Sequence, residues 1–355
     1  MREFGSEFPI TATPDFFFKK LVGQFKSHRF LETGRQGLRL IARELYSSNS
    51  LAILPAYCCK TMVNPFIEEK WNVAYYPILS NLDGDADVIN SLVEKAPDNS
   101  VLLLMNYFGF SNVNGIIAKL NNREKVKIIY DITHCVFDID NEYIEGVDYY
   151  VCSIRKWVGL NSGALVCANS DFKNDIILNV ESEFVNIRKK AMEDNLRYQT
   201  TGDIDEKRTF KAALKEAALR IDSIPREMDR ASVIMLEGLN CNYLLWKRRF
   251  NLNHLYNIIR GNKKITFLPG MEEIMNSGHC FFMLPILLEE RDYYQKQLSD
   301  RGLYAQILWP LMDEARQSSS IAATMESKML AIPIDQRFSY NDIEDIGRII
   351  NSTIV

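Results

Sequence analysis

Three short motifs hold residue types that can bind an anion or transfer a proton. Residues 34–37, Gly-Arg-Gln-Gly, open a predicted helix, and glycines at a helix start let backbone N–H groups approach a phosphate. Asp131 and His134 follow one apolar run, and Ser153 and Lys156 follow the next one. Each motif also has an ordinary explanation on its own: a loop before a helix, a helix N-cap and a solvated lysine.

The apolar runs before these motifs predict the elements that position them. The runs are short, rich in β-branched and aromatic residues, and mostly apolar on both faces, which is typical of strands covered by helices on both sides. Helical patterns lie between them, at residues 85–93 and 114–120. Strands that alternate with helices predict right-handed crossovers and a mainly parallel sheet, which binds ligands at the carboxyl ends of its strands. The predicted strands are residues 51–54, 73–76, 101–105, 126–130, 149–152 and 163–167.

The pattern changes in the second half of the chain. Residues 172–239 read as mainly helical, with one polar stretch at residues 199–206. We expect an α/β large domain at residues 1–240 and a smaller α+β domain at residues 241–355. The elements predicted for the smaller domain are helices at 242–260, 291–301 and 340–350 and strands at 265–268 and 279–284.

Composition argues against several classes of function. The chain of 355 residues has 47% apolar and 25% charged residues and a net charge of −4, so no basic field favours nucleic acid or an anionic membrane. The seven cysteines include no C-x-x-C pair, which argues against a metal site and fits a reducing cytoplasm. Residues 1–9 carry two glutamates and no apolar stretch, so we expect no signal peptide.

The three motifs together resemble a known family. Their order and separation are similar to those of fold type I pyridoxal phosphate (PLP) enzymes, in particular the DegT/DnrJ/EryC1/StrS sugar aminotransferases. Residues 106–109, Asn-Tyr-Phe-Gly, resemble the family's His-x-Tyr-Gly segment, and residues 329–335 resemble its closing Leu-x-Leu-Pro strand. The resemblance implies an aspartate-aminotransferase-like large domain and a PLP cofactor.

The resemblance also implies roles for residues around the cofactor ring. Lys156 would form the Schiff base with the cofactor aldehyde and then act as the general acid and base. Asp131 would pair with the pyridine nitrogen and keep it protonated. His134 would lie near the ring and its 3-oxygen.

Further residues are implied for the phosphate and the ring face. Ser153, Gly34 and Arg35 would hold the phosphate group. Either Tyr57 or Cys59 would cover the ring: the motif register favours Cys59, while an aromatic ring stacks better, so we expect Tyr57. No metal ligand is predicted.

The function implied by the resemblance is transamination. An amino acid donor, by family resemblance glutamate, would pass its amino group to a keto or aldehyde acceptor such as a nucleotide-linked keto-sugar, in a homodimer. Two alternatives stay open. One is a PLP lyase or desulfurase, which needs a reactive cysteine, although Cys280 lies in an apolar run. The other is a PLP-fold protein that binds a partner without turnover.

Overall fold

The computed structural model describes residues 17–47, 49–141, 144–177 and 182–355. Its contacts divide the chain into two compact units. The first unit consists of residues 46–147 and 242–355, and the second consists of residues 17–45 and 148–241, each within the described ranges. The predicted division into residues 1–240 and 241–355 stays a prediction.

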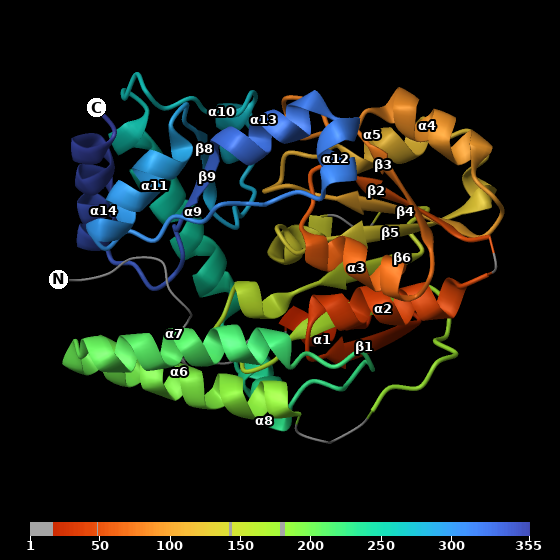
Figure 1. The fold of residues 1–355 in the computed structure, drawn as a ribbon, viewed down its shortest axis with the longest axis horizontal. Helices are drawn as coiled ribbons and strands as arrows, with labels where there is room; N and C mark the ends of the chain where they lie inside the picture. Colours follow the sequence, from red (N-terminus) through yellow and green to blue (C-terminus); the bar gives the residue numbers. More distant parts are fainter. Residues whose placement is uncertain (1–16, 48, 142–143, 178–181) are drawn as a thin grey trace. The chain divides into compact units, whose positions relative to one another are not determined.

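The first unit contains four strands of a mainly parallel sheet. The four strands of the first unit run parallel in the order β5-β4-β2-β3 (Figure 1). Every residue of β4 is buried, as expected for a strand covered on both faces. The mainly parallel α/β architecture is therefore confirmed. This part contains β2 (Leu51–Pro55), α3 (Lys60–Glu68), β3 (Asn72–Tyr76), α4 (Ala86–Lys95), β4 (Ser100–Met105), α5 (Val113–Ala118), η1 (Arg123–Lys125), β5 (Val126–Asp131) and η2 (Val136–Asn141).

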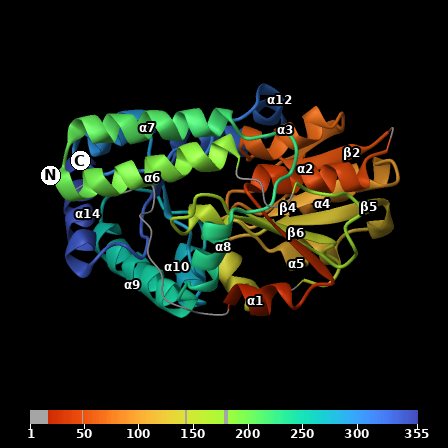
Figure 2. The same cartoon turned by 90° about the horizontal axis from the view of Figure 1, so that it is seen from below.

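The second unit holds three antiparallel strands and a helical hairpin. Strand β7 pairs antiparallel with β1 on one side and with β6 on the other. Helices α6 and α7 lie side by side in both views (Figures 1 and 2), joined by a turn in which Gly202 has a φ of 73°. That left-handed conformation suits glycine and ends α6 within the polar stretch predicted at 199–206. The unit contains α1 (Phe17–Val22), β1 (Ser27–Leu31), α2 (Gly34–Leu45), β6 (Tyr149–Cys152), η3 (Ile154–Lys156), β7 (Ala164–Ala168), α6 (Glu183–Thr201), α7 (Ile204–Leu219) and α8 (Arg230–Glu237).

The C-terminal part of the first unit corrects two strand predictions. Residues 265–268 form only one bridge, between Thr266 and Leu287, and the strand predicted at 279–284 instead begins at Leu284. A short apolar run fits a buried irregular segment as well as a strand, so periodicity could not separate the two. The elements are α9 (Cys241–Ile259), α10 (Met271–Asn276), β8 (Leu284–Leu287), α11 (Arg291–Asp300), α12 (Asp313–Ser318), α13 (Ser320–Lys328), β9 (Met329–Ile332) and α14 (Tyr340–Thr353).

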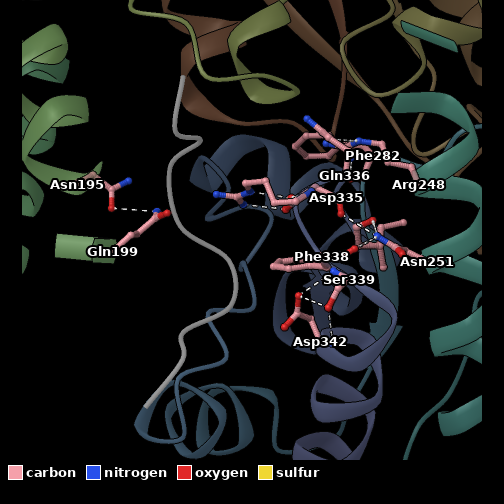
Figure 3. Close-up of polar contacts among 12 residues, drawn as sticks. Asn195, Gln199, Arg248, Asn251, Phe282, Asp335, Gln336, Phe338, Ser339 and Asp342 are labelled. Atoms are coloured by element: carbon pink, nitrogen blue, oxygen red, sulfur yellow. Dashed lines mark hydrogen bonds and ion pairs between the residues drawn. The ribbon is translucent and has the colours of Figure 1, made fainter. Parts of the chain in front are cut away.

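Buried polar side chains of α9 hold the segment that leads into α14 (Figure 3). Arg248 is 1% exposed and donates from Nε to Gln336 at 2.9 Å and from a terminal nitrogen to the carbonyl of Phe282 at 2.8 Å. The amide of Asn251 donates to the carbonyls of Asp335 at 2.8 Å and Ile334 at 3.2 Å (Figure 3). Buried backbone carbonyls need such partners, so these two residues fix the path of the segment.

Among the helices that the structure describes, none combines the length and apolar character that a membrane crossing requires. The described residues also hold no cluster of histidine, cysteine and acidic side chains that could bind a metal ion.

Candidate functional site

The second unit brings Gly34 and Ser153 into contact. Gly34 is the first residue of α2, and Ser153 directly follows β6. A Cβ atom on Gly34 would lie 3.4 Å from the Cβ of Ser153 and 3.8 Å from its backbone nitrogen. The start of this twelve-residue helix therefore lies directly against Ser153. A helix start beside a hydroxyl donor is a suitable cradle for a phosphate.

Lys156 lies one turn beyond Ser153 in the same unit. The backbone N–H of Lys156 donates to the carbonyl of Ser153 at 3.3 Å and closes the 3₁₀ turn η3. Lys156 is half-buried, whereas Trp157 behind it is fully buried. Ser153 and Lys156 thus lie in one 3₁₀ turn, and a hydroxyl and an amine this close in sequence are residue types that a phosphorylated aldehyde such as PLP would need. Arg35 is half-buried in the first turn of α2, and its predicted phosphate contact stays a prediction.

The first unit holds Asp131 at the carboxyl end of β5. Asp131 is 5% exposed, and its register partner is Met105, the last residue of β4. One carboxylate oxygen accepts the N–H of Thr133 at 2.8 Å. This bond closes an Asx turn, and it is not the helix N-cap that the sequence offers as an ordinary explanation, because η2 begins only at Val136. A buried aspartate at a strand end is also a suitable partner for a cationic ring nitrogen, and that role stays a prediction.

His134 is enclosed by aromatic rings of the first unit. It has no exposed surface, and its ring centroid lies 4.7 Å from Phe282, 4.7 Å from Phe108 and 5.6 Å from Trp309. The planes of His134 and Phe282 are only 18° apart, so the two rings stack. The predicted contact between His134 and a cofactor stays a prediction.

The structure distinguishes the surroundings of Tyr57 and Cys59. Tyr57 has no exposed surface, its hydroxyl donates to the carbonyl of Leu308, and its ring packs 5.4 Å from Trp309. Burial raises the pKa of Tyr57. Cys59 is only half-buried at the start of α3, with its sulfur 2.9 Å from the hydroxyl of Thr61. Cys59 is therefore the more accessible of the two, and the expected role of Tyr57 in covering the ring stays a prediction.

Sequence reasoning missed a buried polar cluster between the loop that follows Lys156 and the start of α8. Ser162 in the loop after Lys156 contacts Asp229 and Ser232 at the start of α8. The spacing Asp-x-x-Ser at 229–232 is a recognisable helix N-terminus signal, since aspartate is a preferred N-cap. That signal locates the start of the helix, but it does not reveal which loop the aspartate contacts.

No protein-family model matches the sequence, and no curated protein matches it. Solved structures do match. Helicobacter pylori PseC, an aminotransferase involved in the biosynthesis of pseudoaminic acid, is 13% identical, with a TM-score of 0.70 over 99% of both chains.

Two further solved structures agree with that likeness. The putative sugar aminotransferase Spr1654 from Streptococcus pneumoniae, in its PMP form, is 12% identical, with a TM-score of 0.66 over 98% of this chain and 92% of that one. A DegT DnrJ EryC1 StrS aminotransferase from Brucella abortus is 12% identical, with a TM-score of 0.65 over 95% of this chain and 88% of that one. The chain therefore has the fold of these aminotransferases, which is the fold that its three motifs predict.

Proposed function

We propose that this protein is a PLP-dependent aminotransferase with Lys156 as the residue that binds the cofactor covalently. The observation that carries the proposal is the turn in which Lys156 follows Ser153, with the glycine start of α2 against that serine. Solved structures of the same fold include PLP and PMP forms of a sugar aminotransferase. Bound PLP supplies an aldehyde and an electron-accepting ring.

The chain's own residues would share the remaining work. Ser153, Gly34 and Arg35 would bind the phosphate and fix the position of the cofactor. Asp131 would hold a proton on the ring nitrogen, since a buried carboxylate stabilises a neighbouring cation. The freed amine of Lys156 would move the proton between the substrate carbon and the cofactor, as a general acid and base.

The substrates are proposed by class. The donor is an amino acid, with glutamate as the first candidate, and the acceptor is a keto or aldehyde group on a sugar that carries a nucleotide. Support comes from the motif resemblance and from the sugar aminotransferases of the same fold. We further infer a homodimer in the cytoplasm, which light scattering and cell fractionation test.

The desulfurase alternative has little support. It needs a thiolate near neutral pH, but Cys280 is 1% exposed and its burial raises the thiol pKa to about 12. At pH 7 this thiol is almost entirely protonated. We therefore do not pursue it as a second candidate function.

Borohydride trapping tests the cofactor assignment. Purified protein is incubated with PLP, reduced, digested and analysed by mass spectrometry. We expect the cofactor on the peptide that contains Lys156 and none in Lys156→Ala. Lys189→Ala is the matched control, because Lys189 is exposed on α6. A wild-type protein that retains no cofactor on Lys156 would refute the assignment.

The half-reaction with an amino donor tests transamination separately. We expect glutamate to change the visible absorbance of the wild-type protein. The change should be about 10²–10⁴-fold slower in Lys156→Ala loaded with cofactor, since that is the usual contribution of a positioned acid and base. A protein that binds PLP on Lys156 but responds to no amino donor would support the partner-binding alternative.

A further inference from the structure

The loop that follows Lys156, residues 157–163, is buried, and its end is hydrogen-bonded to the turn that carries Lys156. Trp157 and Ser162 have no exposed surface. The carbonyl of Gly163 accepts the N–H of Arg155 at 3.2 Å, and the N–H of Gly163 donates to the carbonyl of Glu32 at 2.9 Å. The end of the loop is thus bonded directly to the residue before Lys156. Any displacement of residues 162–163 would be transmitted to the turn that carries the lysine.

The hydroxyl of Ser232 provides a partner for the backbone of this loop. Its oxygen accepts the N–H groups of Asn161 at 3.0 Å and Ser162 at 3.2 Å. Ser232 itself has no exposed surface. A buried backbone N–H without a partner is costly, and one hydroxyl satisfies two of them here.

Asp229 connects the loop to the start of α8 through both carboxylate oxygens. One oxygen accepts the N–H of Ser232 at 3.0 Å and caps the helix. The other accepts the hydroxyl proton of Ser162 at 2.6 Å, and that hydroxyl oxygen accepts the N–H of Asp229 at 3.0 Å. Capping needs only one oxygen. The second oxygen therefore makes a short, charge-assisted bond whose only described partner lies in the loop behind Lys156.

We propose that Ser162, Asp229 and Ser232, together the Asp229 clamp, are positioning residues that fix the turn carrying Lys156. The inference rests on the proposed function, in which the position of Lys156 determines its reach to the cofactor. A second contact supports the same loop from α6, where Arg188 donates from Nε to the carbonyl of Leu160 at 3.3 Å and is itself 4% exposed. The loop is thus held by side chains from two helices.

Asp229→Asn tests the clamp, because it keeps the shape of the side chain and the oxygen that caps α8. It removes the charge and the acceptor that faces Ser162. The first readout is the pH dependence of the visible absorbance of the PLP-loaded enzyme, which reports the surroundings of the lysine nitrogen. We expect its midpoint to shift by about half a pH unit or more. The rate of the donor half-reaction should fall about tenfold or more, as for the loss of one hydrogen bond to a charged group.

A matched control separates capping from positioning. Asp203 is the N-cap of α7, is exposed and accepts the N–H of Asp205 at 2.8 Å. Asp203→Asn therefore makes the same substitution at the same helix position without a loop contact, and we expect wild-type absorbance and rate. If Asp229→Asn does not fold, Ser162→Ala gives the same readouts, and Ser162→Thr should restore the absorbance midpoint because it keeps the hydroxyl.

The outcomes distinguish this inference from the proposed function. If borohydride traps no PLP on Lys156 of the wild-type protein, the proposed function is refuted, and the positioning role is refuted as well because it rests on that function. Wild-type protein that forms the bond, together with a clamp variant of unchanged absorbance midpoint and rate, overturns the positioning role alone. A shifted midpoint in Asp229→Asn or Ser162→Ala, with Asp203→Asn unchanged, supports it.

Discussion

Gly37 packs against the sheet with no room for a side chain. A Cβ atom at this position would lie 2.7 Å from a γ-methyl of Val166 and 3.2 Å from a γ-methyl of Val151. Carbon atoms pack at about 3.5–4.0 Å, so Gly37→Ala forces a displacement of about 1 Å. The valine side chains cannot easily turn away, because β-branched residues are restricted at χ1 and both are buried. We therefore expect α2 to move away from β6 and β7.

Two opposing effects determine how much Gly37→Ala changes the free energy of unfolding. Alanine is favoured over glycine inside a helix by about 1 kcal/mol. Overpacking of a well-packed core typically costs about 1–3 kcal/mol. We expect a net loss of about 1–2 kcal/mol in the free energy of unfolding. Because α2 begins at Gly34 beside Ser153, the same displacement should weaken PLP binding.

Urea denaturation and a double-mutant cycle test this reasoning. Val166→Ala removes the methyl group that the new Cβ would meet, so the double variant should be more stable than the sum of the single changes predicts, by about 1 kcal/mol. Gly261→Ala is the control, because nothing lies within 4 Å of a Cβ there. A Gly37→Ala variant as stable as wild type, without coupling to Val166→Ala, would refute the packing argument.

Two further predictions concern the segment that leads into α14. Burial opposes ionisation of Asp335, but Arg337 and Arg248 outweigh it and lower the pKa of Asp335. The ionised Asp335 carboxylate therefore stabilises the folded protein fully above the unfolded pKa of about 4, and this contribution is lost as pH falls through the lower folded pKa. Asp335→Asn should thus have a smaller free energy of unfolding than wild type at pH 7. Urea denaturation in acid should show that this difference disappears. Asn251→Ala leaves the carbonyl of Asp335 without the side-chain N–H that donates to it at 2.8 Å. We expect the free energy of unfolding to fall by about 1–3 kcal/mol. An unchanged midpoint of urea denaturation would contradict this expectation.

The local elements of the α/β part could be predicted from the sequence. The apolar runs at 101–105 and 126–130 became β4 and β5, and the run at 149–152 became β6. Such runs are short, and both their periodicity and their β-branched composition are visible within a few residues. The same reasoning failed for most of the run at 279–284, because residues 280–283 are buried without forming a strand and β8 begins only at Leu284. Burial and strand pairing are separate properties, and only the second requires a partner strand.

The order of the motifs along the chain was likewise visible in the sequence, together with the PLP fold that it predicts. Lys156 follows Ser153 by one turn because three residues span a 3₁₀ turn, which is a local property. Contacts between distant residues were not visible. Asp229 bonds to Ser162 across 67 residues, and the rings around His134 come from three separate segments.

The sequence by itself therefore determined which residues carry the candidate chemistry, and the tertiary structure decided how each is held. Residue type and short spacing can be read from a few neighbouring residues, so Lys156 and Asp131 could be chosen as candidates from their positions after predicted strands. The enclosure of His134 and the clamp behind Lys156 depend on the packing of helices and loops that lie far apart in the chain. No short window of sequence records that packing, because it follows from the whole core closing around each side chain.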